Sequence, residues 1–219
     1  MFGGVKPEKT KFLKYRRVIM MKDFWDERYG EEGLAYGETP NVYLSEITDQ
    51  ITDGGSVLVV GDGEGRNGVW LAKQGFDVTC IDYSPVAIDK INAFASQNAV
   101  SVNTICADMN EWNWPREKFD AVVSIYVHFP LEVRATLHQK MVDALKSGGK
   151  ILMEAFNKDQ LQYKSGGPPV FEMLFSEAML REDFSSVDIL EMEEKVVYLD
   201  EGKYHCGDGA VVRMIAQKR

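Results

Sequence analysis

The chain has 219 residues, of which 45% are hydrophobic and 27% are charged, enough for one globular domain with a sizeable core. Its net charge of −9 is uneven, because residues 1–20 carry six basic side chains and one acid and the remainder therefore carries −14. So acidic a body repels a phosphate backbone, which argues against nucleic-acid binding, and no apolar run approaches the ~18 residues that span a membrane.

The N-terminal segment is predicted to be separate from the fold. Residues 1–20 are basic but lack the continuous apolar core and the cleavage site of a secretory signal. We therefore expect a basic tail over residues 1–20, a single domain over residues 21–219 and a cytoplasmic location.

Strands and helices are expected to alternate along the domain. The predicted helices are 23–28, 41–51, 66–74, 85–98, 131–145 and one that opens over 176–181; the predicted strands are 56–61, 77–82, 101–106, 119–125, 149–156, 186–199 and 209–218. Ser84-Pro85 is a ready helix start, with a capping hydroxyl before a proline. This alternation predicts an α/β fold, a doubly wound and mostly parallel seven-stranded sheet that ends in an antiparallel hairpin.

A glycine-rich turn after the first strand is the most informative motif. Val57–Val60 reads as a buried strand, Gly61, Gly63 and Gly65 follow at alternate positions, and a helical pattern opens behind them. Glycines at such a turn let backbone N–H groups approach a ligand. Asp82 ends the next strand, where a carboxylate can accept hydrogen bonds from ribose hydroxyls, so the pattern predicts a nucleoside-cofactor site.

Two glycine registers leave the cofactor open at this point. Gly63-x-Gly65-x-x-Gly68 matches the dinucleotide fingerprint and would suit an NAD-linked oxidoreductase. Gly61-x-Gly63-x-Gly65 matches S-adenosylmethionine-dependent methyltransferases. The dinucleotide register needs the strand to run on to about Gly63, and the helical run behind Gly65 leaves little room for that.

The segments that follow resemble the successive motifs of class I methyltransferases. They are Ala107-Asp108-Met109, the strand from Phe119 to Ser124, and the glycine turn at Gly148-Gly149 before a fifth strand. Gly-Arg-Asn after the glycine loop, then Leu-Ala-x-x-Gly-Phe-Asp-Val, looks like the tellurite-resistance and thiopurine methyltransferase group. The Ala35-Tyr36-Gly37 segment and the tail from Leu199 are similar to that group as well.

One position departs from the family pattern. The family carries an acid two residues before the first glycine, tied to the methionine end of the cofactor, and this chain has Val59 there. Asp62 and Glu64, inside the loop, are the candidates to replace it.

The resemblance implies a cofactor side of the site. Gly61, Asp62, Gly63 and Gly65 would approach the ribose and methionine parts of S-adenosylmethionine, and Asp82 would hold the ribose hydroxyls. Tyr83 and Met109 would wall the adenine, and Asp108 would accept from its amine. Tyr36 is expected to cover the sulfonium as a lid residue, since an aromatic face favours a cation.

Ser124, near the end of the fourth strand, is also expected on the cofactor side, and the acceptor side is expected where the chain leaves that strand. Tyr126, His128 and Phe129 are the substrate-side candidates, with His128 the best available base for an oxygen or nitrogen acceptor. His205 is expected to lie away from the pocket, and the tryptophans to pack against surfaces.

No metal site is expected, because the three cysteines and three histidines show no ligand spacing. Cys80 and Cys106 fall in apolar strands and read as buried reduced thiols.

The leading hypothesis is methyl transfer to a small soft acceptor such as a thiol, a thiopurine or a tellurite- or selenium-type anion. An NAD-linked oxidoreductase and a cofactor-binding protein without turnover are the alternatives. The partner is expected to be a small molecule, with no nucleic acid and no membrane. The sequence does not determine the oligomeric state.

Overall fold

A computed structural model describes residues 22–219, so the predicted tail over residues 1–20 lies outside the described residues. The helices are α2 (Lys22–Tyr29), α3 (Val42–Glu46), α4 (Arg66–Lys73), α5 (Pro85–Gln97), α6 (Leu131–Ala144) and α7 (Glu177–Asp183). The strands are β1 (Ser56–Val60), β2 (Asp77–Asp82), β3 (Asn103–Cys106), β4 (Phe119–Ile125), β5 (Leu145–Phe156), β6 (Asp188–Asp200) and β7 (Cys206–Gln217). Short 3₁₀ turns cover Thr48–Gln50, Lys158–Gln162 and Phe171–Met173.

The strands form one seven-stranded sheet in the order β3-β2-β1-β4-β5-β7-β6. The neighbours among β1 to β5 pair in parallel, whereas β7 is antiparallel to both β5 and β6. The predicted fold class is therefore confirmed, including the C-terminal hairpin.

Alternating strand residues divide the core between the two faces of the sheet. Leu58 and Val60 pack in one apolar cluster with Leu137 of α6. Val57 and Val59 point the other way and pack with helices α3, α4 and α5. Val57–Val60 of β1 are buried on both faces of the sheet, which is why these four positions form a continuous apolar run.

Several element boundaries differ from the sequence expectation by a few residues, and two of the differences have a clear local cause. The helix expected over 41–51 is broken into α3 and a 3₁₀ turn, and the Thr48 hydroxyl donates to the carbonyl of Leu44, at 2.8 Å, at the break. β5 begins at Leu145 rather than at residue 149, because Leu145 already pairs with Phe119 before an irregularity in the register.

Cys106 is a correction to the sequence expectation. Cys80 is buried as expected, but Cys106 is exposed. β3 lies at the edge of the sheet, so its side chains have neighbours on fewer sides than those of central strands.

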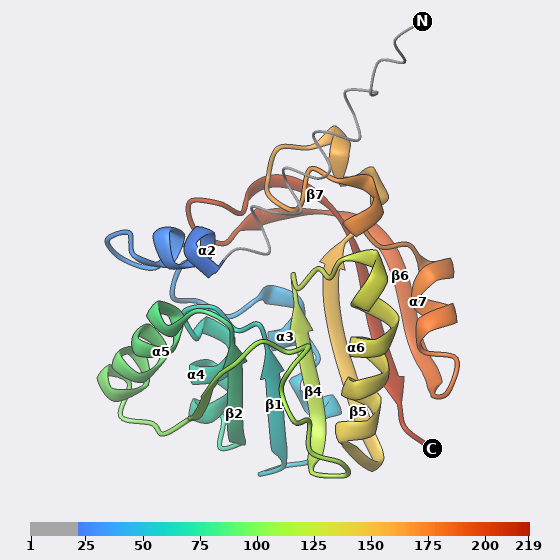
Figure 1. Cartoon of the computed structure of the whole chain (residues 1–219), viewed down its shortest axis with the longest axis horizontal. Helices are drawn as coiled ribbons and strands as arrows, with labels where there is room; N and C mark the ends of the chain where they lie inside the picture. Colours follow the sequence, from blue (N-terminus) through green and yellow to red (C-terminus); the bar gives the residue numbers. More distant parts are fainter. Residues whose placement is uncertain (1–21) are drawn as a thin grey trace, which may run out of the picture.

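The carboxyl ends of the parallel strands define one edge of the molecule. Strands β1 and β4 point toward this edge, and α2 lies beyond it (Figure 1). The sheet reverses its winding between β1 and β4, the place where open α/β sheets bind ligands. Within residues 22–219, no helix is both long and apolar enough to cross a membrane.

Candidate cofactor and acceptor site

One pocket opens at the carboxyl edge and collects segments that are far apart in the sequence. Of the predicted site residues, those that line it are Tyr36, Gly61, Asp62, Gly63, Asp82, Tyr83, Asp108, Met109, Tyr126, His128 and Phe129. Gly65 and Ser124 were expected in the site but are not among its lining residues. Ser124 is buried within β4. A Cβ on Gly65 would lie 3.0 Å from Cγ1 of Ile91, so this glycine lies against α5.

The glycine loop forms a cradle that side chains would fill. Gly61 and Gly63 have φ of +58° and +60°, in the left-handed region that favours glycine. A Cβ on Gly61 would lie 2.8 Å from Cγ2 of Val127, and one on Gly63 would lie 2.8 Å from the hydroxyl of Tyr29. Backbone atoms therefore face the pocket here.

The end of β1 decides between the two glycine registers. The strand ends at Val60, so Gly61 is the first residue of the turn, and α4 begins at Arg66. The dinucleotide register needs a strand that reaches Gly63, and the observed boundary does not supply one. The geometry favours the S-adenosylmethionine register.

Asp82 is held directly beside the glycine loop. Its carboxylate accepts a hydrogen bond from the backbone N–H of Gly63 and one from that of Ser84, both at 2.9 Å. Burial raises the pKa of Asp82 to about 6, although these N–H donors favour the ionised form.

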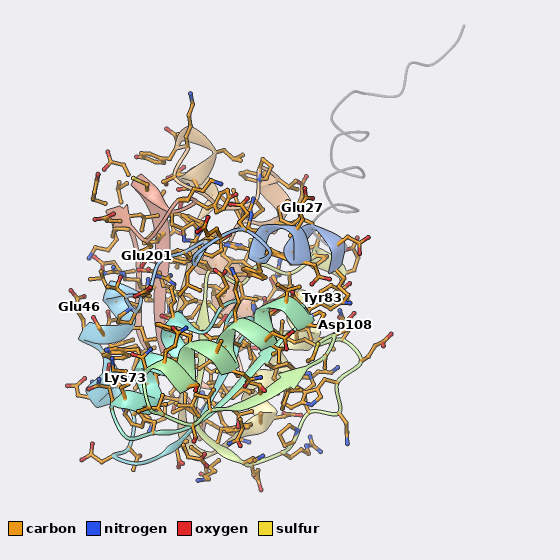
Figure 2. The ribbon with its side chains drawn as sticks, turned by 90° about the vertical axis from the view of Figure 1, so that its left-hand side faces the viewer. Glu27, Glu46, Lys73, Tyr83, Asp108 and Glu201 are labelled. Atoms are coloured by element: carbon orange, nitrogen blue, oxygen red, sulfur yellow. The ribbon has the colours of Figure 1, made fainter. Side chains whose placement is uncertain are left out.

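Tyr83 and Asp108 come from neighbouring strand ends and meet at the same part of the pocket (Figure 2). Asp108 is partly exposed and accepts from the backbone N–H and the side-chain amide of Asn110. Met109 lines the pocket beside it. This is an apolar wall with one carboxylate at its rim, which suits a purine with an exocyclic amine.

The two loop acids that were candidates to replace the acid missing at Val59 both bind protein groups. Asp62 accepts from the backbone N–H of Gly68 at 3.1 Å and from the thiol of Cys80 at 3.1 Å. It thereby satisfies a free N–H in the first turn of α4, whose N-cap, a glycine, has no side chain. Burial raises the pKa of Asp62 to about 7.

Glu64 holds the segment between α2 and α3. One oxygen accepts from the backbone N–H of Ala35 at 2.6 Å, and the other lies 2.7 Å from the ammonium of Lys90. The same ammonium donates to the backbone carbonyls of Glu31 and Gly33. Glu64 and Lys90 together fix the chain that follows α2 over the glycine loop.

Neither acceptor-side group proposed from the sequence has a free proton-accepting atom. Nδ1 of His128 donates to the carbonyl of Met173 at 2.8 Å, and its Nε2 accepts from the backbone N–H of Phe156 at 3.3 Å. Burial lowers the pKa of His128 to about 4. The hydroxyl of Tyr126 donates to Glu154 at 2.6 Å, and burial raises the pKa of Tyr126 well above its ordinary value.

Tyr126 also carries local backbone strain. Its φ is +56°, a conformation that residues with a side chain rarely adopt. Its ring stacks on Phe156 at 4.7 Å between centroids and meets His205 edge-on at 4.6 Å. The end of β4 therefore presents an aromatic wall whose position depends on tertiary contacts.

His205 lines the pocket, contrary to the sequence expectation. It lies in the turn between β6 and β7, and its ring is 4.6 Å from that of Tyr36. Because β7 is antiparallel to β5, β6 runs toward the carboxyl edge and delivers this turn to the site. The predicted antiparallel hairpin was therefore a signal in the sequence from which the position of His205 could have been inferred. Trp25, expected to pack against a surface, also lines the pocket.

A buried polar network adjoins the pocket at Arg66, which is one of its lining residues. Arg66 and Glu201 form an ion pair at 2.8 Å, with both side chains less than 10% exposed. The side-chain amide of Asn41 donates to Glu201 at 2.9 Å and to Glu154 at 2.7 Å, and Glu154 also accepts from Arg213 at 2.6 Å. The network joins the residue before α3, helix α4, strand β5 and the C-terminal hairpin.

These residues fit S-adenosylmethionine. The cradle at Gly61 and Gly63 would take the polar middle of the cofactor, the carboxylate of Asp82 its ribose, and the wall at Tyr83 and Met109 its adenine. Aromatic rings from Tyr36 and Tyr126 also line the pocket, and their faces would favour a cationic sulfonium.

Comparisons with known proteins point to the same cofactor. The family described as "Methyltransferase domain" matches residues 57–149. The "Probable S-adenosyl-L-methionine-dependent methyltransferase TehB" of Haemophilus influenzae is 27% identical over 143 residues, which cover 64% of this chain and 48% of that protein. The chain thus spans about half the length of this relative.

Two further relatives carry different acceptors in their names. A thiopurine S-methyltransferase of Nitrosospira multiformis is 25% identical, over 68% of this chain and 76% of that protein. A ubiquinone biosynthesis O-methyltransferase of Coxiella burnetii is 31% identical, over 56% and 53%. Among solved structures, TehB from Haemophilus influenzae superimposes with a TM-score of 0.68 at 23% identity, over 90% of this chain and 67% of that one, which shows a shared fold.

Proposed function

Because the chain carries a methyltransferase domain of the S-adenosylmethionine-dependent class, we propose that it transfers a methyl group to a small, soft acceptor: a thiol, a thiopurine or a tellurite- or selenium-type anion. A soft anion arrives ionised and needs no base from the protein. The proposed reaction therefore requires neither a nucleophile nor a metal ion from the protein.

The main support for this proposal is that both ring nitrogens of His128 are already engaged in hydrogen bonds. A hydroxyl or amine acceptor has to lose a proton in the transition state, which requires a positioned base. His128 has both nitrogens in hydrogen bonds to backbone groups, and the hydroxyl of Tyr126 is a donor to Glu154. Thiols lose their proton close to neutral pH without such help.

The bound cofactor supplies an activated methyl group on a positive sulfur. The protein's part is to align the acceptor and to exclude water. The glycine loop and Asp82 fix one partner, and the aromatic wall of Tyr126, Phe129 and Phe156 shapes the space for the other. Helix α2 contributes Trp25 and Tyr29 to the cover over this space.

Oxygen methylation is a second candidate, favoured by one observation. His205 lines the pocket, and its Nδ1 lies 3.5 Å from Glu201, at the outer limit of a hydrogen bond. Burial lowers the pKa of His205, so the ring is neutral and able to accept a proton. A relative named as an O-methyltransferase agrees with this alternative.

A product screen distinguishes the candidates. The protein is incubated with S-adenosylmethionine and, separately, thiophenol, 6-mercaptopurine, selenite, tellurite and catechol, and methylated products are identified by mass spectrometry. We expect products from the sulfur, selenium or tellurium acceptors. Exclusive methylation of catechol, lost in His205→Asn, would support oxygen transfer. Cofactor binding with no product from any acceptor would favour a binding protein without turnover.

The remaining expectations stay predictions. A small-molecule partner and the lack of nucleic-acid binding are supported by the charge of the chain, and the single domain over 21–219 and the cytoplasmic location rest on sequence alone. Methylation of a nucleic acid without small-molecule turnover would contradict this proposal.

A further inference from the structure

Arg28 places a positive charge at the wall of the pocket. It lies near the end of α2, one residue before Tyr29, whose hydroxyl reaches the glycine loop at Gly63. Its guanidinium donates to the hydroxyl of Tyr36 at 3.0 Å and lies 4.1 Å from the ring centre of Tyr204. The side chain is thus fixed in direction by aromatic neighbours.

Within the described part of the chain, the guanidinium of Arg28 lacks the ion pair that neutralises Arg66, a second cation of the pocket wall. Arg66, which also lines the pocket, is paired with Glu201 at 2.8 Å. Arg28 has no carboxylate within 4 Å among residues 22–219, and its one side-chain hydrogen bond there is to a neutral phenol. A partly buried cation in a concave, aromatic wall favours an anion from a ligand.

The acids of the glycine loop strengthen the argument. The family resemblance implies an acid at position 59, tied to the methionine end of the cofactor, but this chain has Val59, which is packed in an apolar cluster. Asp62 and Glu64 are held by protein donors, Gly68 and Cys80 for the first and Ala35 and Lys90 for the second. Neither acid of the glycine loop forms an ion pair with Arg28, so the guanidinium keeps its charge for a ligand.

We propose that Arg28 is a carboxylate receptor of this pocket. The proposal rests on the proposed function, and it adds a ligand-binding role for α2. A carboxylate can come from two sources, the amino-acid end of the cofactor or an acidic acceptor, and both present the planar oxygen pair that a guanidinium binds with two N–H groups.

The test is calorimetry on the full chain with Arg28→Met, Arg28→Lys and the control Lys22→Met. Lys22 lies on the same helix, is largely exposed and pairs with Asp26, so its loss removes one charge of the same sign outside the wall. The first probe pair is S-adenosylhomocysteine and 5′-methylthioadenosine, which share the nucleoside and sulfur but differ in the amino-acid end. The second pair, with S-adenosylhomocysteine present, is 4-mercaptobenzoate and thiophenol.

A cofactor carboxylate at Arg28 predicts that Arg28→Met weakens S-adenosylhomocysteine binding at least about tenfold and leaves 5′-methylthioadenosine within about twofold. An acceptor carboxylate predicts the same contrast within the second pair. Arg28→Lys should lose less in either case, because it keeps the charge without the planar fork.

Two results would overturn the inference. One is an equal loss for the charged and uncharged member of each pair, which indicates that Arg28 only holds the shape of α2. The other is no loss for any carboxylate probe. A wild-type protein that binds neither S-adenosylhomocysteine nor 5′-methylthioadenosine would instead refute the proposed function, so the two failures are distinguishable.

Discussion

The carboxylate of Asp82 accepts a hydrogen bond from the backbone N–H of Gly63 at 2.9 Å, which ties the end of β2 to the loop that follows β1. A group expected to hold the ribose therefore also fixes the loop beside it. This dual contact makes Asp82 a sensitive position for cofactor binding.

Replacing Asp82 with alanine should weaken S-adenosylhomocysteine binding by about 1.5–3 kcal/mol, because hydrogen bonds to a charged acceptor are lost. Isothermal calorimetry measures the change, and Asp89→Ala, at an exposed position on α5, is the matched control. Unchanged affinity in Asp82→Ala would remove Asp82 from the site.

Gly63 and Gly75 separate the effect of space from that of backbone strain. Both have positive φ, but a Cβ on Gly63 would lie 2.8 Å from the Tyr29 hydroxyl, whereas one on Gly75 has nothing within 4 Å. Both alanine variants should lose stability, measured by thermal unfolding. Only Gly63→Ala should also lose cofactor affinity, and the larger Gly63→Val should abolish it; normal binding by Gly63→Val would mean that the loop is only a turn.

Asp62 should make the stability of the protein fall as the pH rises. Burial raises its pKa from the model-peptide range near 4 to about 7, so the folded protein binds a proton more tightly than the unfolded chain. The stabilisation is full below about pH 4 and is lost as the pH rises toward 7. The groups that face Asp62 are Cys80, Asp82 and Arg66.

Asp62→Asn removes this titration, so the variant should gain on wild type by more than ~1 kcal/mol between pH 4.5 and 7.5 in urea unfolding. Asp53→Asn, at an exposed position, should show no such trend. A constant difference between Asp62→Asn and wild type across this range would contradict the assignment.

The buried pair of Arg66 and Glu201 should matter far more to stability than an exposed one. Arg66→Met leaves the Glu201 carboxylate without its cation at 4% side-chain exposure and should cost about 3–5 kcal/mol. Lys195→Met removes a pair with Glu193 that is about 40% exposed and should cost at most about 1 kcal/mol. Similar losses in the free energy of unfolding for the two variants, measured by chemical unfolding, would show that the buried pair contributes no more to stability than the exposed one.

His128→Asn should reduce kcat for a thiol acceptor by clearly less than the 10²–10⁴-fold of a lost general base. The variant and wild type should also share one pH profile between pH 5.5 and 8.5, because burial lowers the pKa of His128 to about 4 and any limb in this range belongs to other groups, such as Asp62 and Asp82. Initial rates from pH 5.5 to 8.5, corrected for any change in folded fraction, provide the measurement. A larger loss, with a pH limb that is present in wild type and absent from His128→Asn, would point to an acceptor deprotonated by His128.

Local pattern was sufficient for the fold. The apolar run at Val57–Val60 could only be a strand buried on both faces, and Ser84-Pro85 starts α5 as expected, with the serine hydroxyl accepting from Ala87. The alternation of such elements restricts the topology to a doubly wound sheet. The position of Asp82 relative to the glycine loop follows, since parallel strands end at one edge.

What the side chains at that edge can do was decided only by tertiary structure. His128 reads as a base from its position after β4, but its nitrogens are bound by Met173 and Phe156, which are 45 and 28 residues away in the sequence. His205 enters the pocket because the hairpin turn returns to it. A hydrogen-bond partner distant in sequence leaves no local signal, whereas burial and periodicity do, so the site's location was readable from sequence and its free chemical groups were not.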